Sequence, residues 1–252
     1  MRVAGFVIAL LVATPAHADA AFDFYTSGKY DEAMHAGAAE NNATGFTTAA
    51  RAALADATTR SAPCLACLKL AENYARRAIA ADPKAPDGHT YLAVALGYEA
   101  RIEGLVKARL RNYPGEAKRE LDAALALEPK NPWALAALGG WNVEIVRTGG
   151  ARMAYWLYDA SIDQGLDAFD AAFKSAPSNL AIRFQYALSL SGLDAAGYHS
   201  QIVESFERVA KMAPASAYER LAKARAAELL ALLKSGDLGA FKVRVRRYQG
   251  YP

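Results

Sequence analysis

The sequence predicts an all-α fold. Alanine-rich segments with helical periodicity fill nearly the whole chain after the first 20 residues. Runs of β-branched residues that alternate with polar ones, which are typical of strands, are scarce. Four turns that contain proline divide the helical segments, and each is expected to end one helix before the next begins: Asp82-Pro83, Glu128-Pro129, Ala176-Pro177 and Ala213-Pro214.

The first 18 residues have the pattern of a cleaved signal peptide. Arg2 precedes an apolar run from Val3 to Ala13, and Ala16-His17-Ala18 has the small-x-small form of a cleavage site. The apolar run is too short to cross a bilayer, so we expect no membrane insertion after cleavage behind Ala18. Residues 19–252 would then form a single helical domain in the periplasm or outside the cell.

The only two cysteines, Cys64 and Cys67, stand at the predicted start of a helix. A C-x-x-C at this place suits a structural disulfide, a pair of idle thiols or a redox centre. Thioredoxin-like enzymes place this motif after a strand, and no strand pattern precedes it here. An oxidising compartment favours a persistent disulfide, which would pin the first turn of the helix. Leu68 stands where a c-type haem needs histidine, and no histidine has zinc-ligand spacing, so we expect neither metal nor cofactor.

Positions around the first three prolines repeat. Five residues before each proline stands an alanine, and nine and ten residues after it a large residue precedes a small one. A small residue lets a partner helix approach closely while the large one fills the neighbouring groove. The pairs are Leu92-Ala93, Leu138-Gly139 and Tyr186-Ala187. Pro214 fits this pattern less well, as expected for a terminal unit.

This pattern resembles the tetratricopeptide repeat over most of residues 21–235, and Gly28–Ala33 looks like the turn between the two helices of an N-terminal unit. The resemblance implies a right-handed superhelical solenoid of antiparallel helix pairs. The segments 128–135 and 138–141 further resemble the group of regulators of microtubule dynamics and their exported bacterial relatives. An exported bacterial protein would not meet microtubules, so this resemblance implies a fold and no microtubule function.

Two of the predicted units are larger than the family repeat. The four prolines are separated by 46, 48 and 37 positions, against a repeat of about 34 residues. We expect the first excess to extend a helix through residues 101–111. The second lies at residues 147–158, where two glycines precede an aromatic cluster that either packs inside the superhelix or lines a groove.

Charge and motifs exclude several classes of function. The full chain has a net charge of +3, and loss of Arg2 with the signal peptide leaves about +2, which does not favour nucleic acid or an anionic membrane as the main partner. We expect the basic residues at 242–247, and the stripe of Lys107, Arg109 and Arg111, to be solvated. No lipase-type elbow, zinc-protease, phosphate-loop or dinucleotide motif occurs, so we expect no enzymatic activity.

The sequence therefore favours a non-catalytic periplasmic scaffold that holds a protein or peptide partner in a concave groove. The candidate contacts are His89, Arg183 and Tyr186 together with Tyr155, Trp156 and Tyr158. The alternative is a small-molecule-binding accessory of a periplasmic transport system, which requires an enclosed apolar pocket roofed by residues 147–161. A third hypothesis is a thiol oxidoreductase at Cys64 and Cys67.

Overall fold

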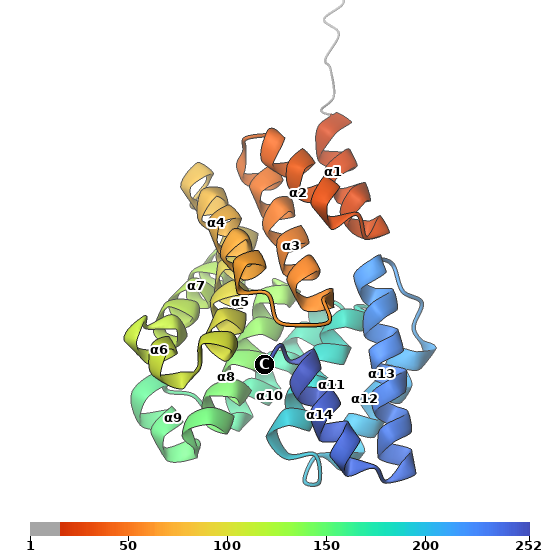
Figure 1. Ribbon diagram of the computed structural model, residues 1–252. Helices are drawn as coiled ribbons and strands as arrows, with labels where there is room; N and C mark the ends of the chain where they lie inside the picture. The colour runs from red at the N-terminus through yellow and green to blue at the C-terminus, as the bar shows by residue number, and fades with distance from the viewer. Residues whose placement is uncertain (1–15) are drawn as a thin grey trace, which may run out of the picture.

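A computed structural model describes residues 16–252, and in this part of the chain the fold is all-α, as predicted (Figure 1). The helices of the first half are α1 (Ala16–Ser27), α2 (Tyr30–Ala39), α3 (Ala43–Thr59), α4 (Leu65–Ala81), α5 (Pro86–Glu103), α6 (Leu105–Leu110) and α7 (Tyr113–Leu127). Those of the second half are α8 (Pro132–Gly149), α9 (Ala151–Tyr158), α10 (Ile162–Ser175), α11 (Leu180–Asp194), α12 (His199–Lys211), α13 (Ala217–Ser235) and α14 (Leu238–Tyr248).

The predicted signal peptide, residues 1–18, lies outside the described residues apart from the backbone of the first turn of α1. Among the helices that are described, none combines the length and the apolar character needed to cross a membrane.

The proline-containing turns separate helices as predicted. Pro86 and Pro132 occupy the first turns of α5 and α8, where a missing backbone N–H costs no helical hydrogen bond. The side chain of Asn131 accepts hydrogen bonds from the N–H groups of Trp133 and Ala134 and so caps α8. The predicted N-terminal turn is also present, because α1 ends at Ser27 and α2 begins at Tyr30.

The prediction that one helix extends through residues 101–111 is wrong. Helix α5 ends at Glu103, and Gly104 has φ +82° and ψ +165°, a conformation that is essentially restricted to glycine. The short α6 therefore starts in a new direction. Gly150 has nearly the same angles, φ +76° and ψ +155°, and separates α8 from α9 in the same way. Both enlarged units thus consist of a long helix, a short helix and a second long helix.

The small residues of the repeat bring helices together as expected. A Cβ added at Gly139 of α8 would lie 2.9 Å from the carbonyl oxygen of Gly165 in α10 and 2.6 Å from the ring of Phe169. Phe169 is fully buried beside this contact. Gly139 is therefore required for the close approach of α8 and α10.

The two ends of the helical array meet. Helix α13 packs against α1 and α3, and Arg225 donates a hydrogen bond of 3.0 Å to the carbonyl oxygen of Thr58. The C-terminus lies in the middle of the molecule (Figure 1), where the carbonyl oxygen of Gln249 accepts a bond of 2.8 Å from Arg101. In an extended solenoid each repeat contacts only its neighbours. Here α13 instead contacts helices from the start of the chain.

Candidate functional site

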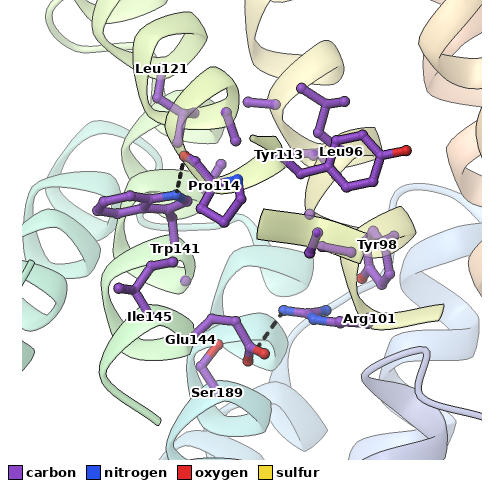
Figure 2. Close-up of a pocket in the computed structure, with 18 of the residues that line it drawn as sticks. Leu96, Tyr98, Arg101, Tyr113, Pro114, Leu121, Trp141, Glu144, Ile145 and Ser189 are labelled. Atoms are coloured by element: carbon purple, nitrogen blue, oxygen red, sulfur yellow. Dashed lines mark hydrogen bonds and ion pairs between the residues drawn. The ribbon is translucent and has the colours of Figure 1, made fainter. Parts of the chain in front are cut away.

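A cavity of about 560 Å³ lies among the helices (Figure 2). Helices α3, α5, α7 and α8 supply most of its lining, and α1, α6, α9, α10, α11, α13 and the C-terminal segment complete it. The helices reach it with their inner faces: along α5 the lining residues include Tyr91, Val94, Tyr98 and Arg101, which are spaced by three or four positions. Most of the lining side chains are aliphatic or aromatic.

One end of the cavity is apolar. Leu96, Tyr113, Leu121 and Trp141 lie around it in Figure 2. The indole N–H of Trp141 donates a bond of 3.1 Å to the carbonyl oxygen of Pro114, so the polar atom of this buried side chain is satisfied within the protein. A ligand that contacts this end would meet hydrocarbon and aromatic surface.

The other end contains a cluster of charged and polar groups. Arg101 and Glu144 face each other with a closest N–O distance of 3.8 Å, and Arg147 binds the same carboxylate at 2.7 Å. The Tyr251 hydroxyl also hydrogen-bonds Glu144. Burial opposes ionisation of Glu144, but Arg101 and Arg147 hold its pKa at about 2. Burial raises the pKa of Tyr251 to about 12, so this phenol remains a neutral donor.

A further cation, Arg51 of α3, borders the cavity beside aromatic rings. Its guanidinium carbon lies 4.3 Å from the ring centre of Tyr25 and 5.9 Å from that of Trp133. Burial acts against its charge, yet the hydroxyl groups of Tyr91 and Tyr25 leave the pKa of Arg51 raised. Within residues 20–252 no carboxylate oxygen lies within 4.0 Å of this guanidinium. The cavity is therefore bordered by a cation that is held among aromatic rings and has no direct carboxylate partner in residues 20–252.

Part of the segment 147–161 covers the cavity. Met153, Leu157 and Tyr158 of α9 belong to the lining, and Tyr158 packs edge-to-face on Trp141 with ring centres 6.1 Å apart. Tyr155 and Trp156 of the same helix point to solvent, with 62% and 77% of their surface exposed. This aromatic cluster therefore divides between the cavity and the outer surface.

The sequence profile of the family described as Regulator of microtubule dynamics protein 1-3 matches residues 16–234. The chain belongs to this family. Comparison with curated proteins gave no match. The family match ends at the last turn of α13, so α14 and Tyr251, which lines the cavity, lie beyond it.

The remaining candidate contacts of this family member lie away from the cavity. His89 is held between the Glu120 carboxylate, 2.6 Å from Nδ1, and the Pro83 carbonyl oxygen, 3.1 Å from Nε2. Arg183 lies over the ring of Phe173 at 4.3 Å, and Tyr186 packs edge-to-face on the same ring. Of the six residues proposed from the sequence, only Tyr158 lines the cavity.

The two cysteines of the regulator of microtubule dynamics family member are joined, with their sulfur atoms 2.02 Å apart. Cys64 is the N-cap of α4, and its sulfur accepts the N–H of Cys67 at 3.2 Å. The crosslink thus lies at the first turn of α4, as expected. No group of three or more metal-ligating side chains occurs in the described part of the chain.

Sequence reasoning missed several residues that shape the cavity: Arg51, Tyr98, Arg101, Glu144 and Tyr251. A signal for some of them existed. Tyr98 and Arg101 continue the spacing of Tyr91 along one face of α5, and Glu144 lies three residues after Trp141 on α8. Nothing local indicated Tyr251, because its place depends on the return of the C-terminal segment to α8.

Proposed function

We propose that this protein binds a predominantly apolar small molecule in the central cavity and performs no chemistry on it. The observation that carries the proposal is the cavity itself. Its volume falls within the range of about 300–1,000 Å³ that is usual for small-molecule sites, and its few polar groups gather at defined places. The cluster around Glu144 and the cation of Arg51 would orient polar groups of the ligand.

A scaffold that grips an extended peptide needs an open concave groove. The return of residues 249–251 to α5 and α8 supports the small-molecule proposal instead, because these residues occupy the place where a peptide would enter. A protein partner on the outer surface is compatible with the same cavity. A peptide along the concave side would first have to displace the C-terminal segment.

We further propose that the helices form tetratricopeptide-like pairs and that the protein acts in the periplasm, as a ligand-binding accessory of a transport system. The signal-like residues 1–18 and the repeated positions around the prolines support these parts of the proposal. The family description refers to microtubule dynamics. An exported protein would not meet microtubules, so we do not extend that role to this chain.

The test uses a cavity-filling variant and a fluorescent apolar probe. Gly97 lines the cavity, and a Cβ added there meets no atom within 4 Å, so Gly97→Leu would fill ligand space without a clash at Cβ. We expect the wild type to bind 1-anilinonaphthalene-8-sulfonate saturably, and Gly97→Leu to bind it at least about tenfold more weakly, since the side chain occupies several probe contacts. Gly239→Leu, the same change at an exposed site in α14, is the matched control.

Both leucine variants should unfold near the temperature of the wild type. Equal probe affinity in Gly97→Leu and the wild type would contradict the proposed site. Native mass spectrometry of protein purified from its own host supplies a second readout, in which a bound mass of a few hundred daltons should disappear in Gly97→Leu and persist in Gly239→Leu.

A further inference from the structure

The two short helices carry large apolar side chains that no part of the described chain covers. On α6, Val106 and Leu110 are 74% and 82% exposed, and on α9 Tyr155 and Trp156 are 62% and 77% exposed. We call these four side chains the α6–α9 patch. Large aromatic and aliphatic residues gathered at this degree of exposure usually mark a surface that meets another apolar phase.

The two helices occupy corresponding places in the fold. Each follows a long inner helix through a glycine with positive φ, Gly104 before α6 and Gly150 before α9. Both also contribute to the lining of the same cavity, through residues such as Leu105 and Met153. Figure 1 shows α6 directly above α9 at one edge of the molecule. The two helices that carry the α6–α9 patch thus border the same cavity.

The charged residues within the two short helices are all basic. Neither α6 nor α9 contains an acidic residue, and Lys107, Arg109 and Arg152 are exposed. In the described part of the chain no carboxylate oxygen lies within 4.0 Å of these three cations. Glu103, which is mostly buried, pairs with Arg111 at 3.4 Å, and Asp159 follows the last turn of α9. The surface therefore combines apolar side chains with free positive charge.

We propose that the α6–α9 patch docks this protein on a lipid bilayer that carries anionic headgroups. Tryptophan and tyrosine prefer the boundary between water and hydrocarbon, where Trp156 and Tyr155 would lie. Val106 and Leu110 would enter the acyl region, while the neighbouring Lys107, Arg109 and Arg152 extend to headgroup phosphates. The charge complementarity favours a membrane over a second copy of this chain, because a second copy would present the same cations.

This docking goes beyond ligand binding in the cavity, and it does not require the cavity to be occupied. It would orient one side of the cavity towards the bilayer, so that an apolar molecule could pass between the two with a short path through water.

The experiment measures co-sedimentation of the purified protein with vesicles. One set contains phosphatidylcholine alone and the other a mixture of phosphatidylcholine and phosphatidylglycerol. We expect binding to the mixed vesicles that weakens as salt rises, with a blue shift of Trp156 emission. The double variant Leu110→Ser/Trp156→Ser should lose at least about tenfold in apparent affinity, because two anchoring side chains are removed while every charge stays.

The matched control is Leu238→Ser/Val243→Ser on α14, where the original side chains are 55% and 67% exposed. This control should bind vesicles as the wild type does. The proposal is overturned if the mixed vesicles fail to bind the wild type at low salt, or if both double variants bind equally. It is also overturned if Leu110→Ser/Trp156→Ser abolishes a concentration-dependent dimer in the absence of lipid, since a second copy would then cover the patch.

Discussion

Gly250 lets the C-terminal segment return to the cavity. Its φ is +82°, and a Cβ at this position would lie 2.9 Å from the ring of Tyr98, which lines the cavity. Gly250→Ala combines a strained backbone with a steric conflict, and we expect a loss of about 1–3 kcal/mol in the closure of this segment. Amide hydrogen exchange at residues 249–251 should accelerate. Unchanged protection would show that the segment does not need this approach.

The ionisation of Glu144, at the charged end of the cavity, should make the stability of the fold depend on pH in acid. Its folded pKa of about 2 is below the ordinary value of 4.5, so ionised Glu144 stabilises the fold fully above about pH 4.5. This stabilisation is lost as the pH falls from there towards about 2. Urea unfolding at several pH values should show the decline in the wild type and a flatter profile in Glu144→Gln over this window. Identical profiles would contradict the assigned ion pairs.

At the scale of the element, the glycines that precede α6 and α9 should respond differently to substitution by alanine than glycines inside a helix. Gly150 combines φ +76° with ψ +155°, so Gly150→Ala should destabilise the protein by about 1–3 kcal/mol although no atom lies near the added Cβ. Gly97 is in a regular helix with equally open space, and Gly97→Ala should be neutral or stabilising by up to about 1 kcal/mol. Thermal unfolding of the two variants tests the contrast, which equal shifts would contradict.

The crosslink at α4 has a local role. It joins two residues only three positions apart, so replacing Cys64 and Cys67 with serine should cost at most about 2 kcal/mol in unfolding free energy. Serine at position 64 can still cap the helix. We expect probe binding in the cavity to remain as in the wild type. A protein that loses its activity with the two cysteines while it remains folded would favour the oxidoreductase hypothesis.

The helices could be predicted from the sequence better than the way in which distant helices and the C-terminal segment meet. Proline turns such as Asp82-Pro83 are strong local signals, so the long helices could be placed in order. The break at Gly104 could not be predicted, because one glycine inside a helical pattern is a weak signal that the helix ends. The polar end of the cavity was missed for another reason: Arg101 and Glu144 lie on different helices, and Tyr251 meets Glu144 only through a contact between residues more than 100 positions apart.

At the scale of the whole molecule, the C-terminal segment controls access to the cavity. Deletion of residues 249–252 removes the bond from Arg101 to Gln249 and the contact of Tyr251 with Glu144. We expect a bound probe to dissociate several-fold faster from this truncated chain, because a covering element is lost. Stopped-flow dilution measures the rate. Deletion of the exposed Pro252 alone is the control, and equal rates for both deletions would contradict the role of the segment.

The overall balance of charge hides how the charge is distributed. A net charge near zero gave no reason to expect an anionic surface as a partner. The fold nevertheless gathers Lys107, Arg109 and Arg152 on two helices without acidic residues. Electrostatic attraction to a surface depends on such local clusters within about a Debye length, close to 10 Å in dilute salt, rather than on the sum over the chain.

The contact of residues 249–251 with α5 and α8 also determines when the fold around the cavity can be completed during synthesis. The long helices from α1 to α11 can pack in the order in which they emerge, since most of their partners are sequence neighbours. The bond between Arg101 and Gln249 must wait until residue 249 has left the ribosome. A nascent chain that is stalled before residue 249 would therefore lack Tyr251 in the cavity lining, and the apolar lining would be accessible to chaperones until residues 249–251 arrive.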